Sequence, residues 1–142
     1  MASATAISQA VIAIEKMLKN LKMKRIERFE QAIENKVKDL RAEGINPTLF
    51  WAYRYLEETG NDTIDFDDCI WEHEIEDIAN CLKENGILEF TISSTFSSLI
   101  ETLAEFQKHG FQMAGLTEVN ARYTEVGSNN KKRIPAIRML CI

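Results

Sequence analysis

The stretch from Gly86 to Lys108 constrains the fold more than any other part of the chain. Residues 87–92 alternate apolar and other side chains, which predicts a strand with one buried face. Ser and Thr residues at 93–95 then precede a run in which apolar side chains recur at helical spacing, up to a helix-ending Gly110. The apolar stripe of this predicted helix consists of Phe96, Leu99, Ile100, Leu103 and Phe106.

The residues that follow predict two more strands. Residues 111–123 form an extended run with a bulge or bend expected at Gly115, and a turn at 127–130 leads into a strand over residues 134–140. A strand, a helix and a strand favour a right-handed parallel crossover, and the last two strands should form an antiparallel hairpin. Pro135 lacks an N–H and should lie at a strand start or on an edge. The sequence thus predicts an α+β fold: N-terminal helices followed by a small three-stranded mixed sheet (strand–helix–strand–strand) covered by helices.

The N-terminal third predicts helix, because no Gly or Pro occurs between Thr5 and Arg41. The rhythm of apolar residues slips before Ile26, so this region is either two helices or one long helix of about 57 Å, which would project from a small domain. We therefore expect a helical region over residues 1–46 and an α+β domain over 47–142. Five residues have the spacing of a coiled-coil seam, which packs either within the chain or on another copy: Ile7, Val11, Ile14, Leu18 and Leu21.

A second predicted helix begins at Asn46-Pro47, a favourable N-cap and first helical position, and stops at Gly60. It carries Trp51, Tyr53 and Tyr55, the densest aromatic group of the chain. An aromatic group at helical spacing is either core or a docking surface.

Charge is strongly separated along the chain, whose net charge is -5. Residues 57–77 hold ten carboxylates and no Lys or Arg. Part of this acidity fits a helix with Trp71, Ile75, Ile78 and Leu82 on its apolar stripe, with Asp67 or Asp68 as the N-cap. The candidate interaction residues of this segment are Asp62, Asp65, Asp67, Asp68, Glu72 and Glu74.

Motifs for metal binding and catalysis are absent from the sequence. A calcium loop starting at Asn61 fails, because Phe66 occupies the position that needs glycine. The three cysteines lack metal-ligand spacing and are expected as reduced thiols, so we predict no cofactor and no metal. A hairpin rich in basic residues near the C-terminus is expected to be solvated, and we do not expect direct nucleic-acid binding. With no apolar run near the ~20 residues that cross a bilayer, we expect a cytoplasmic protein without membrane association.

Two stretches, EFTISSTFSSLIETLAEFQKHGFQMAGLTEVNARY and RIPAIRM, together with Trp71 and the preceding TIDFDD, resemble a set of short uncharacterised proteins from Gram-positive bacteria and their mobile elements. The resemblance covers residues 47–142. It implies an α+β fold and a mobile-element setting, and it carries over no activity and no binding residues.

Three functional hypotheses follow. The first is a non-enzymatic protein–protein interaction module that self-associates through its N-terminal helix. The second is an acidic decoy or inhibitor of a mobile element, whose carboxylates imitate the charge of nucleic acid. The third is an enzyme with an unrecognised site, for which the candidate residues are Glu89, His109, Glu118 and Arg122.

Overall fold

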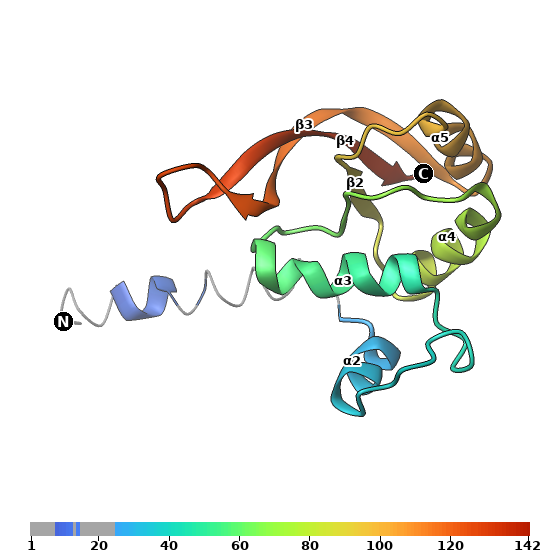
Figure 1. The fold of residues 1–142 in the computed structure, drawn as a ribbon, viewed down its shortest axis with the longest axis horizontal. Coiled ribbons are helices and arrows are strands. Elements are labelled where there is room, and N and C mark those ends of the chain that lie inside the picture. The colour runs from blue at the N-terminus through green and yellow to red at the C-terminus, as the bar shows by residue number, and fades with distance from the viewer. Residues whose placement is uncertain (1–7, 13, 15–24) are drawn as a thin grey trace.

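The computed structural model describes residues 8–12, 14 and 25–142 (Figure 1). Residues 8–12 and 14 are helical. The remaining elements in chain order are α2 (Glu27–Glu34), α3 (Pro47–Thr59), β1 (Asp65–Phe66), the 3₁₀ turn η1 (Glu72–Glu74), α4 (Ile75–Glu84), β2 (Glu89–Ile92), α5 (Leu99–Lys108), β3 (Phe111–Thr124) and β4 (Lys131–Cys141). None of the helices in these described ranges is long and apolar enough to cross a membrane.

The α+β class is confirmed, but the sheet has four strands in the order β1-β2-β4-β3, and the prediction of three was wrong. The additional strand, β1, is only two residues long and pairs in parallel with β2. It lies within the acidic segment, where neither length nor apolar alternation signals a strand. Its pairing depends on long-range backbone bonds, from Thr91 N to Ile64 O (2.9 Å) and from Ser93 N to Phe66 O (3.0 Å).

The order of the other strands differs in one respect from the expected arrangement. β3 and β4 form the predicted antiparallel hairpin, and its register shifts between Met113 and Leu116, where the bulge at Gly115 was predicted. β4 also pairs antiparallel with β2, so it lies between β2 and β3. β2 and β3 are therefore parallel, but they are not adjacent in the sheet. Pro135 is paired with Glu118 of β3 but lies beyond Ile137, where the pairing of β4 with β2 ends, so it has a strand on one side only, at an edge as predicted.

Aromatic rings fill the core between the sheet and the C-terminal helices. The Phe90 ring centroid lies 4.8 Å from that of Phe106, 5.1 Å from that of Phe111 and 5.4 Å from that of Phe66. The helix α5 begins at Leu99, three residues later than the predicted stripe, and Ile100 is 79% exposed. Phe96 still packs against the core, but from the loop before the helix.

The N-terminal region contradicts a single helix through Arg41. Ile26 is extended, and α2 ends at Glu34 because Lys36 adopts a left-handed backbone conformation with φ 53°. The break expected near Asn20 lies outside the described residues. Phe29 of α2 packs edge-on against Phe50 at 5.6 Å and Tyr53 at 5.5 Å, so α2 covers the side of α3 facing away from the hairpin (Figure 1).

The helix predicted in the acidic segment also begins later than expected. Ile75, Ile78 and Leu82 are buried as the predicted stripe requires. Trp71, in contrast, is 61% exposed and occupies the N-cap position of η1, before α4 begins. Asp67 and Asp68 precede that turn by several residues and cap neither η1 nor α4. The residue that anchors this start is the buried Glu74, whose carboxylate accepts hydrogen bonds from the Trp71 N–H and the Thr48 hydroxyl.

Candidate functional site

The outward face of α3 carries the exposed aromatic residues of the site. The helix forms here because the Asn46 side chain accepts from Leu49 N at 3.0 Å and Pro47 occupies the first turn. Tyr53 points inward and is buried, as the core interpretation predicted, whereas Trp51 is 45% exposed and does not belong to the core. The Trp51 and Tyr55 rings lie one helical turn apart, with centroids separated by 6.2 Å.

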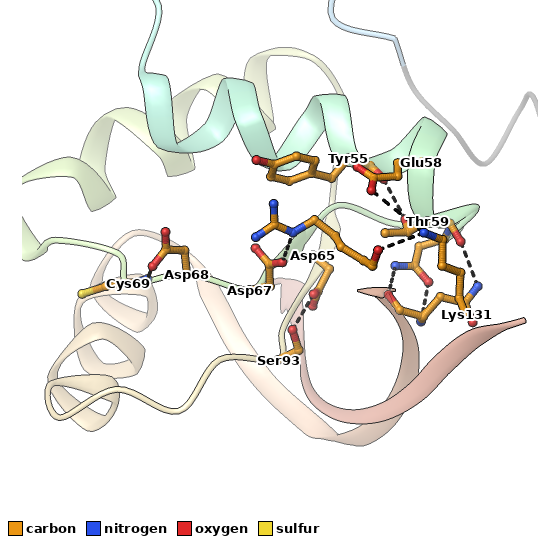
Figure 2. A network of polar contacts seen from close by, with 12 residues as sticks. Tyr55, Glu58, Thr59, Asp65, Asp67, Asp68, Cys69, Ser93 and Lys131 are labelled. Carbon is orange, nitrogen blue, oxygen red and sulfur yellow. Dashed lines mark hydrogen bonds and ion pairs between the residues drawn. The ribbon is translucent and has the colours of Figure 1, made fainter. Parts of the chain in front are cut away.

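An arginine from β3 joins this aromatic face to the acidic segment. Arg122 Nε donates to Asp67 Oδ2 at 2.5 Å, and its Cζ lies 4.0 Å from the centroid of the Tyr55 ring (Figure 2). Partial burial opposes the charged form of Arg122, but the hydrogen bond and charge of Asp67 outweigh it and raise the pKa of the guanidinium. Tyr55 and Asp67 thus hold a cation from two sides.

A groove of about 320 Å³ opens beside this contact. Its walls are aromatic on the α3 side and acidic on the side of the loop after β1. We call it the Arg122 groove, and it is lined by Pro47, Thr48, Trp51, Ala52, Tyr55, Phe66, Asp67, Asp68, Cys69 and Arg122.

The six predicted acidic residues do not form one cluster. Asp67 and Asp68 line the Arg122 groove, whereas Asp62 lines a separate cleft described below. Glu72 is exposed, and Glu74 is buried in the hydrogen bonds that link α3 to η1. Asp65 faces the sheet, where its two carboxylate oxygens accept from Thr91 Oγ1 and Ser93 Oγ at 2.6 Å each. At least three of the six carboxylates therefore have structural partners within the chain.

Burial raises the pKa of Asp65 above its usual value, although the two hydroxyl donors partly oppose the shift. A raised folded-state pKa means that the contribution of this group to stability is fully present below its unfolded pKa and is lost as the pH rises through the folded pKa. We therefore predict that Asp65→Asn, which cannot ionise, gains stability relative to the wild-type protein as the pH is raised from 3 towards 7. Urea unfolding of both proteins across this pH range measures the difference. If the free energy of unfolding of Asp65→Asn minus that of the wild-type protein stayed constant or fell with rising pH, the prediction would be contradicted.

Four of the five basic residues of the β3–β4 hairpin pair with acids of the same chain. In addition to Arg122, Arg138 Nε lies 2.5 Å from Glu89 Oε1, and Lys131 Nζ and Arg133 Nε lie 3.9 Å and 3.8 Å from carboxylates of Glu58 and Glu118. The expected picture of a merely solvated hairpin was therefore incomplete. Such pairs contribute little energy at a surface, but they reduce the positive charge that the hairpin presents.

Side chains also cover the outer edge of β3, beside the groove. Asn61 donates to the carbonyl of Asn120 at 3.0 Å and accepts from its N–H at 2.8 Å, as a neighbouring strand would. Arg133 donates to Glu118 O at 3.1 Å. Lys131, which Figure 2 labels, donates to Arg122 O at 2.9 Å. These contacts occupy backbone groups with which another strand could pair, so this half of the edge is protected.

A second cleft, of about 530 Å³, lies between the sheet and the loop after α3. It brings together two of the four residues considered for catalysis, Glu89 and Glu118. Arg122 lines the other groove, and His109 lies at the end of α5, 3.9 Å from Glu105. Within residues 8–12, 14 and 25–142, no group of three or more His, Cys, Asp or Glu side chains is arranged to hold a metal ion. Cys69, Cys81 and Cys141 form no disulfide in the described part of the chain.

Two residues of the predicted seam fall in the described part of the chain. Val11 is 48% exposed and Ile14 is 51% exposed. Ile7, Leu18 and Leu21 lie outside the described residues.

The fold and the groove define a small α+β domain with an aromatic and acidic surface site. Residues 48–141, about two thirds of the chain, match the family described as a domain of unknown function (DUF7698), and the chain belongs to this family. No curated protein and no solved structure matches the chain. The resemblance to proteins of Gram-positive bacteria and mobile elements stays a prediction.

Proposed function

We propose that the protein is a non-enzymatic interaction module that associates with a second copy of itself through its N-terminal helix. The observation that carries this proposal is the exposure of Val11 and Ile14, which have the spacing of a coiled-coil seam yet are each about half exposed. When another surface covers apolar side chains on a helix, their removal from water lowers the free energy of the complex. The core of residues 26–141 is closed without them, so a partner chain is the natural cover.

Light scattering of the full-length protein across a concentration series tests this proposal. We expect a dimer or higher oligomer. We also expect Val11→Glu/Ile14→Glu to weaken association by at least about tenfold, because the introduced carboxylates would be buried beside the same carboxylates of the second copy. The matched control is Gln9→Glu/Lys16→Gln, which changes the net charge by the same amount away from the seam positions. A monomeric wild-type protein at tens of micromolar, or equal association of both variants, would refute self-association.

The two alternative functions gain less support from the geometry. Decoy activity needs a regular array of free carboxylates, whereas Asp65 and Glu74 are engaged in hydrogen bonds and Asp67 in an ion pair. For an enzyme, the shared cleft of Glu89 and Glu118 is the relevant feature, but Arg138 already pairs with Glu89 there. Both alternatives stay predictions. The same holds for the mobile-element setting, for the cytoplasmic location and for a domain boundary between residues 46 and 47.

A further inference from the structure

The Arg122 groove presents two aromatic rings that are not buried, those of Trp51 and Tyr55, and two carboxylates, those of Asp67 and Asp68. One ring and one carboxylate already hold a guanidinium. Arg122 stacks on Tyr55 at 4.0 Å and pairs with Asp67 at 2.5 Å. A guanidinium is suited to such a place, because its flat faces stack on a ring while its edge donates hydrogen bonds to a carboxylate. The chain itself therefore shows which chemistry this surface accepts.

The second ring and the second carboxylate have no such cation between them. Asp68 is exposed, accepts a hydrogen bond from the neighbouring Cys69 N–H at 2.8 Å, and forms no ion pair within the described residues. Arg54 lies 5.3 Å from the Trp51 ring, but it lines the adjoining hollow with Glu57 and Glu58 and does not line the groove. The side of the groove formed by Trp51 and Asp68 is thus open to a ligand.

Charge selects the kind of ligand. Among the residues that line the groove, Asp67 and Asp68 are acidic and Arg122 is the basic one, and Arg122 is neutralised by Asp67. The carboxylate of Asp68 remains uncompensated, so the groove favours a cation and repels a phosphate group. Trp51 offers the best aromatic surface for that cation, and Trp is also the residue type most enriched where protein contacts concentrate their binding energy.

We propose that the Arg122 groove binds an arginine side chain presented by a partner protein, with its guanidinium between the Trp51 indole and the Asp68 carboxylate. This contact would repeat the one that Tyr55 and Asp67 make with Arg122. It is separate from the seam at Val11 and Ile14 and does not require self-association.

The test is an NMR titration of the full-length, ¹⁵N-labelled protein with the peptide acetyl-Gly-Gly-Arg-Gly-Gly-amide. We expect saturable shifts of the Trp51 indole N–H and the Asp68 amide in the millimolar range, and no such shifts with the citrulline peptide, which is uncharged and almost the same shape. Asp68→Asn should weaken binding by at least about fivefold, because the charge that pairs with the guanidinium is lost. Glu76→Gln removes an equal charge from the exposed face of α4, outside the groove, and should leave binding unchanged.

Several outcomes would overturn the proposal. These are the absence of shifts with the arginine peptide, equal binding of the citrulline peptide, and equal binding by Asp68→Asn. Shifts of the Trp51 indole with a decathymidylate in place of the peptide would show that the groove stacks nucleobases instead. Repeating the arginine titration with Val11→Glu/Ile14→Glu separates this proposal from self-association, since binding should persist in that variant.

Discussion

Replacing Phe90 with alanine is expected to lower the free energy of unfolding by about 3–5 kcal/mol. The Phe90 side chain is fully buried at the centre of β2, and its ring contacts Phe66, Phe106 and Phe111 from three other elements. Alanine removes these contacts and leaves a cavity that the surrounding strands and α5 cannot close by small shifts. Urea unfolding followed by far-UV circular dichroism measures the loss.

The matched control for this change is Ile100→Ala. The spacing of apolar residues in the sequence predicts that Ile100 belongs to the core-facing stripe of the helix, whereas in the structure its side chain is 79% exposed. We therefore expect the free energy of unfolding to change by less than about 0.5 kcal/mol. A loss at Ile100 comparable with that at Phe90 would show that α5 presents a different face to the sheet.

This difference at Ile100 illustrates where the sequence suffices and where it does not. Elements with local signals were predicted well: α3 begins at Pro47 after its Asn46 cap and ends before Gly60, which has a φ of 71°. The hairpin and the bulge at Gly115 follow from turn residues and from the change in alternation. In contrast, α2 ends although no glycine is present, because Lys36 takes the left-handed conformation that sequence patterns assign to glycine or asparagine.

Long-range pairing could not be predicted. A helix between two parallel strands is compatible with adjacent strands and with a strand inserted between them, so the position of β4 was open. The candidate site could not be predicted for the same reason, because it depends on a contact between distant parts of the chain. Arg122 and Asp67 are 55 residues apart, and neither belongs to a local sequence motif. The available signals were the unusual group of aromatic residues on α3 and the dense carboxylates after it. They predicted Asp67 and Asp68 as interaction residues, but not the arginine that the aromatic ring and Asp67 hold.

Glu74→Ala is expected to lower the free energy of unfolding by about 2–3 kcal/mol, a large effect for an acidic residue from a segment that the sequence describes as a charged surface. The Glu74 side chain is 4% exposed. Its carboxylate accepts from Thr48 Oγ1 at 3.0 Å and 3.1 Å, from Asn46 Nδ2 at 3.4 Å and from Trp71 N at 3.3 Å. Alanine leaves these donors without their acceptor and removes a negative charge from beside the N-terminus of α3, where it complements the helix dipole.

Two further variants, Glu74→Gln and Glu57→Ala, distinguish the loss of these hydrogen bonds from a general effect of removing a negative charge. Glu74→Gln keeps one oxygen acceptor and should lose less stability than Glu74→Ala. Glu57→Ala removes the same charge from an exposed position on α3 and should change the free energy of unfolding by less than about 0.5 kcal/mol. If urea unfolding gave equal losses for Glu57→Ala and Glu74→Ala, the carboxylate of Glu74 would not be the link between α3 and η1. If Glu74→Ala alone is destabilised, one acidic residue of the segment stabilises the fold, while Asp68 in the same segment remains free to contact a partner.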